Sequence, residues 1–498
     1  MNENYNIDPN DPTLDKYFDK FRKKIIGYNS VFTAAYGQKR IYYSDWTASG
    51  RLYKDIEDKL CNEIAQYVGN THSESNLTGT LMTKAYHKSQ KIIKKHVNAG
   101  SSDVILMCGS GMTGALAKLM RIMGFQVPYR LRNWVNLELK EKPVVFITHM
   151  EHHSNQTQWE ESLVEVVILK HDGTGLVDLN DLEEQVMKYQ DRTWKVASVT
   201  ACSNVTGIET PVHEIAKIMH KHGGKCFVDY ACSAPHVKID MHKSEEEKLD
   251  AIYFSPHKFL GGPGTPGVAI FCSSLYDNSV PDIAGGGSVE WTDPWGGHKF
   301  FDDIELREDA GTPAFLGTIK TALVVKLKEE MGYEKTLQRE HIINKKVFDS
   351  FKDIKNLHFL ADNHKERLSV FSFYIDDLHY NLGVKILNDK YGIQVRGGCS
   401  CAGTYGHYLL HVDQYTSKQI TDKISCGDYS EKPGWIRMSF HPVNSDEEID
   451  YIINGVIELA KNHKEWVKEY IYLPKTNTFN HLNETTFESD MVAKWLGD

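Results

Sequence analysis

The sequence has no long apolar run. No stretch of its 498 residues approaches the roughly 20 consecutive apolar residues that a membrane-spanning helix needs. The first residues carry Asp8, Asp11 and Asp15 without an apolar core, which fits neither a secretory signal nor an Arg-rich, acid-poor transit peptide. We therefore expect a cytoplasmic protein without a membrane partner.

An excess of positive charge is also lacking. The chain has 57 Lys and Arg against 67 Asp and Glu, a formal net charge of -10. Because nucleic-acid binding favours a basic face, this composition argues against nucleic acid as the main partner. The nine cysteines lie mostly in apolar runs, which indicates reduced and buried thiols. Only Cys399-Ser400-Cys401 lies in a Gly-flanked polar loop.

Short strand-like runs alternate with amphipathic helical stretches between residues 100 and 275. Continuous apolar strands separated by helices predict an α/β domain with a mostly parallel sheet covered on both faces. Ligands bind such sheets at the carboxyl ends of the strands. The predicted strands are Asp103–Cys108, Val144–Met150, Lys195–Ala201, Lys225–Tyr230, Ala251–Phe254 and Val268–Cys272.

The pattern changes in the last third of the chain. A long Lys- and Glu-rich helical stretch, Leu316–Asp353, leads to strand-like Leu368–Ile375 and Ile436–Phe440, which predicts a smaller α+β domain. We predict three parts: residues 1–45, an N-terminal segment that packs on the small domain; residues 46–315, the large domain; and residues 316–498, the small domain.

Two charged residues follow predicted strands of the large domain. Lys258 follows Ser255-Pro256-His257 and precedes the Gly/Pro-rich loop Gly261–Gly267, which allows close backbone approach. Such a lysine forms a Schiff base if a desolvated site lowers its pKa, and is otherwise a solvated loop lysine. Asp229 ends an apolar strand, where a pyridinium nitrogen, a helix N-terminus or a core salt bridge would satisfy its carboxylate.

Two further strings follow strands. The amides of Gly109-Ser110-Gly111-Met112-Thr113-Gly114 would bind a phosphate at a helix N-terminus. A dinucleotide site would also need an acid about 20 residues later, and Tyr129–Trp134 contains none, so a single phosphate is favoured. In Glu151-His152-His153-Ser154-Asn155, His152 is either a polar loop residue or a group that stacks on an aromatic cofactor and moves protons.

In this order the strings resemble fold-type I pyridoxal 5'-phosphate enzymes, namely the class V aminotransferase family, with cysteine desulfurases and selenocysteine lyases as the nearest group. The resemblance runs from Tyr43 to Asp450. It implies pyridoxal 5'-phosphate as the cofactor and an amino acid as the substrate. It also implies that Lys258 carries the cofactor as a Schiff base, Asp229 pairs with the pyridine nitrogen and His152 stacks on the ring.

The resemblance implies further cofactor contacts. Asn204 would approach the ring hydroxyl, and Thr312 would reach the phosphate of a neighbouring subunit, which implies a homodimer with shared active sites. Cys232 stands where many relatives carry a Gln that contacts the ring hydroxyl, and a thiol cannot hydrogen-bond comparably. The residues implied to hold the phosphate are Gly111, Met112, Thr113, Ser255 and His257.

Two strings bear on the reaction. The loop Arg396–Ala402 is similar to the family's Arg-x-Gly-x-x-Cys-Ala, whose cysteine receives sulfur as a persulfide, and the alignment selects Cys401. Arg437 resembles the arginine that binds the substrate α-carboxylate, for which its planar fork is suited, and we assign Arg396 to substrate binding as well. The implied enzyme is a cysteine desulfurase that releases alanine and has a sulfur-acceptor protein as a partner.

Alternatives stay open. The connection between Cys401 and Arg437 is longer than in compact desulfurases, which weakens the assignment of the substrate. In the alternative interpretation, Cys401 is a loop thiol without persulfide chemistry, and the enzyme is an aminotransferase or lyase that acts on another amino acid. Without a cofactor the chain would be a non-catalytic scaffold. A zinc site is a weaker reading, because Cys-x-Cys is tighter than the usual spacing, and we expect no metal. Its ligands would be Cys399, Cys401, His407 and His411.

Overall fold

The computed structural model describes residues 12–109 and 111–497, which divide into two compact units. The first unit comprises residues 12–48, Asn204–Ile208 and 334–497. The second comprises Ser49–Ser203 and Glu209–Tyr333. None of the helices in the described ranges combines the length and the apolar composition that a bilayer span requires.

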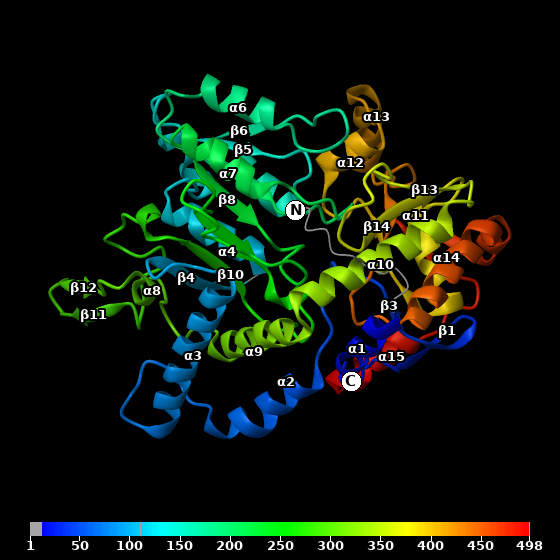
Figure 1. Ribbon diagram of the computed structural model, residues 1–498, viewed down its shortest axis with the longest axis horizontal. Helices are drawn as coiled ribbons and strands as arrows, with labels where there is room; N and C mark the ends of the chain where they lie inside the picture. Colours follow the sequence, from blue (N-terminus) through cyan, green and yellow to red (C-terminus); the bar gives the residue numbers. More distant parts are fainter. Residues whose placement is uncertain (1–11, 110, 498) are drawn as a thin grey trace. The chain divides into compact units, whose positions relative to one another are not determined.

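A seven-stranded sheet forms the centre of the second unit (Figure 1). Its strands are β4 (Asp103–Cys108), β5 (Val144–Ile147), β6 (Glu165–Ile168), β7 (Lys195–Thr200), β8 (Lys225–Asp229), β9 (Ala251–Phe254) and β10 (Gly267–Cys272). The order is β4-β10-β9-β8-β7-β5-β6, and all pairs are parallel except those that β10 makes with β4 and β9. The predicted α/β class with a mostly parallel sheet is therefore confirmed.

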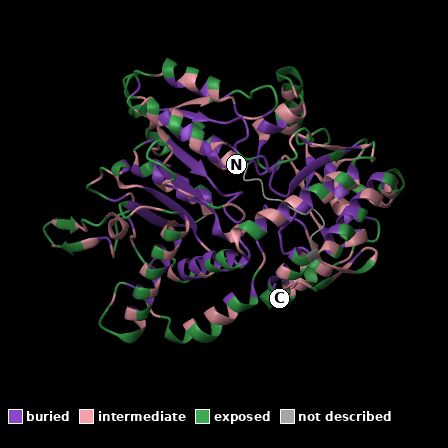
Figure 2. Cartoon of the chain, viewed as in Figure 1, coloured by how far each residue is buried: buried purple, intermediate pink, exposed green. Residues whose placement is uncertain are grey.

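Helices cover this sheet and bury its apolar strands (Figure 2). The helices of the second unit are α2 (Lys54–Asp58), α3 (Leu77–His96), α4 (Gly111–Ile122), α5 (His153–Glu160), α6 (Leu179–Lys188), α7 (Val212–Lys221), α8 (Ile304–Arg307) and α9 (Phe315–Met331), of which α4, α5, α7 and α8 pack directly on strands of the sheet. A hairpin of β11 (Val289–Thr292) and β12 (His298–Phe300) completes the unit. Because α9 packs along α3, the second unit extends to Tyr333, whereas the sequence suggested a boundary after residue 315.

The stretch predicted as one helical region after residue 315 is broken. Gly332 adopts φ +80° between α9 and α10 (Tyr333–Phe351), and this left-handed conformation ends the first helix. The break coincides with the boundary between the two units.

The first unit is built on a four-stranded antiparallel sheet in the order β13-β14-β17-β16. These strands are β13 (Leu357–Phe359), β14 (Val370–Ile375), β16 (Arg396–Gly398) and β17 (Trp435–Ser439). Its helices are α1 (Pro12–Arg22), α10, α11 (Tyr380–Ile386), α12 (Gly403–Leu409), α13 (Gln414–Ser425), α14 (Asp446–Trp466) and α15 (Phe487–Leu496). Two-stranded pairings add β1 (Val31–Ala34) with β2 (Gly37–Arg40), β3 (Tyr42–Tyr43) with β15 (Ile393–Gln394), and β18 (Tyr470–Leu473) with β19 (Thr478–His481).

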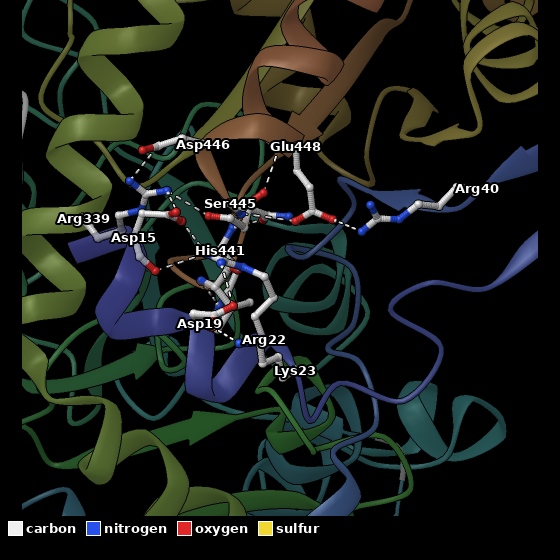
Figure 3. Close-up of polar contacts among 12 residues, drawn as sticks. Asp15, Asp19, Arg22, Lys23, Arg40, Arg339, His441, Ser445, Asp446 and Glu448 are labelled. Atoms are coloured by element: carbon white, nitrogen blue, oxygen red, sulfur yellow. Dashed lines mark hydrogen bonds and ion pairs between the residues drawn. The ribbon is translucent and has the colours of Figure 1, made fainter. Parts of the chain in front are cut away.

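Buried arginines fasten α1 to the first unit (Figure 3). Arg339 of α10 is 1% exposed, and its Nη1 lies 2.8 Å from Asp446 Oδ1 at the start of α14. Arg22 of α1 donates from Nε to the Val443 carbonyl at 2.6 Å and pairs with Asp15. Because a buried guanidinium is stable only when it is paired and hydrogen-bonded, these contacts fix the N-terminal segment in place.

Candidate functional site

The carboxyl ends of two neighbouring strands in the second unit carry Asp229 and Lys258. Asp229 is the last residue of β8, and Lys258 ends a 3-10 turn, Pro256–Lys258, that follows β9. Burial raises the pKa of Asp229 to about 6, and the nearby charge of Lys258 opposes that shift. The two groups are therefore close enough for their charges to interact.

The carboxylate of Asp229 fits a cationic ring nitrogen. Asp229 is 3% exposed, and its Oδ1 accepts a hydrogen bond from the Ala231 amide at 2.7 Å. A buried carboxylate in this setting is stabilised by a cation that it can hold. Such a carboxylate keeps a pyridinium protonated, which is what pyridoxal 5'-phosphate requires.

The N-terminus of α4 forms a cradle with the loop that precedes Lys258. Gly111 adopts φ +60°, and a Cβ built on it would lie 2.9 Å from Ser255 Oγ. The Met112 amide donates to Ser255 Oγ at 2.8 Å, and the Oγ1 of Thr113 lies 2.8 Å from the Oγ of Ser154. The positive end of this 12-residue helix attracts an anion such as a phosphate. Ser110 lies outside the described residues.

His257 belongs to the same cradle, since its Cδ2 lies 3.8 Å from a Cβ built on Gly111. Its Nδ1 lies 3.2 Å from Ser49 Oγ. Burial, with the charge of Lys258, lowers the pKa of His257 and favours a neutral imidazole. All five residues predicted to hold a phosphate are thus gathered in the second unit.

His152 has a fixed orientation because it is the N-cap of α5. Its Nδ1 accepts a hydrogen bond from the Ser154 amide at 3.1 Å. A backbone amide only donates, so the neutral ring carries its proton on Nε2. The ring can therefore offer an N–H from that nitrogen while its other nitrogen anchors it to the helix.

Glu151 is a site residue that sequence reasoning did not assign. Its Oε1 accepts from Thr148 Oγ1 at 2.6 Å and from the Thr200 amide at 2.9 Å, and its Oε2 accepts from Asn155 Nδ2 at 2.7 Å. Asn155 in turn accepts from the Tyr253 hydroxyl at 2.9 Å. Glu151 therefore ties the ends of β5 and β7 to the start of α5. An acid between a predicted strand and His152 was the only signal in the sequence.

Glu151 predicts a specific pH dependence of stability. Burial raises its pKa from 4.5 to about 7, so between these values the folded chain holds a proton that the unfolded chain has released. The free energy of unfolding then falls as pH rises through this window, by up to about 1.4 kcal/mol per pH unit for this proton. In urea unfolding of the cofactor-free chain, the stability advantage of wild type over Glu151→Gln should shrink from pH 4.5 to 7. A pH-independent difference would contradict this role.

The first unit gathers a second set of predicted residues around Arg437. Arg437 is 2% exposed, and its Nη1 donates to the Asn204 carbonyl at 3.0 Å. Its Nη2 lies 2.8 Å from Asp45 Oδ1, and Arg396 Nε lies 3.3 Å from Asp45 Oδ2. Among the described residues, Arg437 Nε and Asn204 Oδ1 are buried without a hydrogen-bond partner. Both atoms remain available to a bound molecule.

The cysteine loop is held in an unusual backbone conformation. Ser400 and Cys401 adopt φ of 50° and 58°, which non-glycine residues rarely do. Asn204 Nδ2 donates to the Ser400 carbonyl at 2.7 Å, and Trp435 Nε1 donates to the Ser400 hydroxyl at 3.2 Å. Cys401 is exposed, whereas Cys399 is half-buried. The loop therefore presents the thiol of Cys401 to solvent.

The described part of the chain does not support the interpretation that the cysteine loop and its neighbouring histidines form a zinc site. No group of three or more metal-ligating side chains is assembled there. His407 lies with Nδ1 2.8 Å from the Gly403 carbonyl and Nε2 2.8 Å from Ser417 Oγ, so both ring nitrogens are engaged.

The remaining predicted residues are more isolated. Thr312 is exposed on the segment before α9. Cys232 is buried, with Sγ 3.8 Å from the Ser203 carbonyl. The predicted site residues are thus divided between the two units. The second unit holds Lys258, Asp229, His152, Cys232, Thr312, Gly111, Met112, Thr113, Ser255 and His257, and the first holds Asn204, Arg396, Cys401 and Arg437.

The chain is similar to known proteins over most of its length. Residues 42–452 match the family described as aminotransferase class-V. A probable cysteine desulfurase of Halalkalibacterium halodurans is 26% identical over 422 residues, which cover 84% of this chain and 92% of the relative. One of Pyrococcus abyssi is 25% identical over 438 residues, with coverage of 85% and 95%.

Solved structures share the fold. An apo cysteine desulfurase from Thermococcus onnurineus superposes with a TM-score of 0.70 at 24% identity, and covers 89% of this chain and 98% of its own. A cysteine desulfurase from Escherichia coli gives a TM-score of 0.68 at 20% identity with the same coverage. The fold and the match define a fold-type I enzyme. The chain belongs to the class V aminotransferase family, whose members are pyridoxal 5'-phosphate enzymes.

Proposed function

We propose that the protein is a pyridoxal 5'-phosphate-dependent cysteine desulfurase, which converts L-cysteine to alanine and transfers the sulfur to Cys401. The observation that carries the proposal is the placement of Asp229 and Lys258 at the ends of adjacent strands, in the same unit as the anion cradle of Gly111 and Ser255. The relatives named above support the choice of reaction.

The residues of the second unit would hold the cofactor. The start of α4, with Thr113, Ser255 and His257, would bind its phosphate. Asp229 would hold the ring nitrogen, His152 would cover the ring, and Lys258 would hold the aldehyde carbon. When bound, the cofactor supplies an electron-withdrawing ring that stabilises negative charge at the substrate Cα.

The chain's own groups would carry out the remaining steps. Lys258 Nζ takes the proton from the substrate Cα. The thiolate of Cys401 attacks the substrate sulfur, so that an S–S bond forms, the Cβ–S bond breaks and its electron pair stays on Cβ. Cβ then takes a proton, for which His152 Nε2–H is suited, Lys258 Nζ returns a proton to Cα, and alanine leaves. Cys401 retains the sulfur as a persulfide, so no further oxidant or reductant is needed.

We further propose a cytoplasmic homodimer that passes the sulfur to an acceptor protein. The exposed thiol of Cys401 supports transfer to a partner. Thr312, exposed on its segment, is suited to reach a neighbouring subunit's phosphate. All nine cysteines are free in the described chain, which supports a reducing compartment.

Turnover of L-cysteine by cofactor-loaded protein tests the proposal. Wild type should form alanine in a 1:1 ratio with sulfur, and should carry a persulfide on Cys401. Cys401→Ser should lower the rate at least about a hundredfold, because the nucleophile is lost. Cys399→Ser is the matched control and should keep the wild-type rate. Equal rates in all three proteins would remove Cys401 from the mechanism, and no turnover in wild type would favour an aminotransferase or lyase for another amino acid.

A further inference from the structure

Asp45 lies between two arginines in the first unit. Arg396 and Arg437 are directly opposite each other in the β16–β17 pair, an arrangement in which two like charges repel. Asp45 contacts both, with Oδ1 2.8 Å from Arg437 Nη2 and Oδ2 3.3 Å from Arg396 Nε. We call these three residues the Asp45 cluster.

The backbone holds Asp45 in this position. It forms a parallel bridge with Ser439, two residues after Arg437 in the chain. The Ser439 amide donates to the Ser44 carbonyl at 2.8 Å, and the Thr47 amide donates to Ser439 Oγ at 3.1 Å. Hydrogen bonds on both sides of Asp45 therefore fix its carboxylate beside β17.

The Asp45 cluster carries one positive charge in excess. Two guanidinium groups, which stay charged, share one carboxylate, and no other acid in residues 12–109 and 111–497 forms an ion pair with either arginine. Arg437 Nε is buried without a partner there, and the Arg396 side chain is 46% exposed. The cluster thus has both the charge and the donors for one more carboxylate.

We infer that Asp45 is a specificity-determining residue, which makes the cluster accept an amino acid with a single negative charge. One substrate carboxylate neutralises the cluster, whereas a second acidic group meets the carboxylate of Asp45 without a compensating cation. The substrate class is therefore an α-amino acid with an uncharged side chain, such as a thiol. This inference rests on the proposed role of Arg437 in carboxylate binding.

Calorimetric binding of two unreactive amino acids to the cofactor-loaded protein tests the inference. L-Alanine carries one acidic group and L-cysteate two, and neither requires desulfuration, so a protein that fails to turn over L-cysteine can still be measured. Wild type should prefer alanine. Asp45→Asn should shift the ratio of the two affinities toward cysteate at least about tenfold. Asp45→Glu, which keeps the charge, should retain the wild-type preference.

Two further variants complete the design. Asp446→Asn removes a carboxylate from the Arg339 pair in the same unit and should leave the affinity ratio unchanged. Arg396→Gln removes a partly exposed cation and should strengthen the preference for alanine. If Asp45→Asn does not fold, the affinity ratio of Arg396→Gln tests the inference in its place. An unchanged ratio in Asp45→Asn and Arg396→Gln would overturn the inference. Failure of wild type to bind either amino acid would overturn it as well.

Discussion

The Lys258→Ala variant is expected to lose the covalently held cofactor. Its rate of substrate Cα-proton exchange should be at least about a thousandfold lower than that of wild type. The lysine would serve both as the point of attachment and as the base, so its removal deletes both functions. Its charge also opposes the effect of burial on Asp229. Without that charge, the pKa of Asp229 should rise further, and the carboxylate would hold a ring nitrogen less well.

The measurement is borohydride reduction of the loaded protein, followed by mapping of the modified peptide. In wild type the label should map to Lys258, and in Lys258→Ala covalent labelling should be lost. Lys238→Ala removes an exposed lysine of the same unit and should label and react as wild type does. A label on another lysine of the wild-type protein would refute the assignment.

Gly50→Ala is expected to displace the lysine loop and to weaken cofactor binding at least about tenfold. Gly50 is buried, and its amide donates to the His257 carbonyl at 2.9 Å. A Cβ on Gly50 would lie 1.8 Å from the Phe259 carbonyl oxygen and 3.1 Å from that of Lys258. Both atoms belong to the backbone, so a side-chain rotation cannot relieve the overlap. The loop must move, and Lys258 must move with it.

Cofactor titration and thermal unfolding measure this effect. The free energy of unfolding should fall by about 1 to 3 kcal/mol, as is typical of overpacking. Gly286→Ala is the matched control, because a Cβ at Gly286 has no atom within 4 Å and its backbone is not left-handed. If Gly50→Ala binds the cofactor as tightly as Gly286→Ala does, the contact between Gly50 and Phe259 does not position the loop.

Strand positions in the second unit were predictable because they depend on local patterns. The apolar runs at Asp103–Cys108 and Ala251–Phe254 have the predicted bounds. Strand β6 was not predicted, although it contains the apolar run Val166-Val167-Ile168, and its residues are half-buried or exposed. The antiparallel direction of β10 could not be predicted from the sequence either, because the direction of a strand depends on how the chain returns to the sheet.

Some residues of the candidate site could likewise be predicted from the sequence, and others could not. Lys258, Asp229 and the start of α4 could be assigned because strand ends and glycine-rich turns mark them in the chain. Glu151, Gly50 and Asp45 could not. Glu151 depends on hydrogen bonds to Thr200, and Gly50 on a backbone contact with Phe259.

By itself, therefore, the sequence determined the fold class, the family resemblance and the order of the cofactor residues, because periodicity and motif spacing are local properties. Only the tertiary structure decided that Asp45 lies between Arg396 and Arg437, and that Gly50 supports the loop of Lys258. These contacts join residues far apart in the chain, whose distance is set by packing and hydrogen bonding of the folded backbone and by no local pattern.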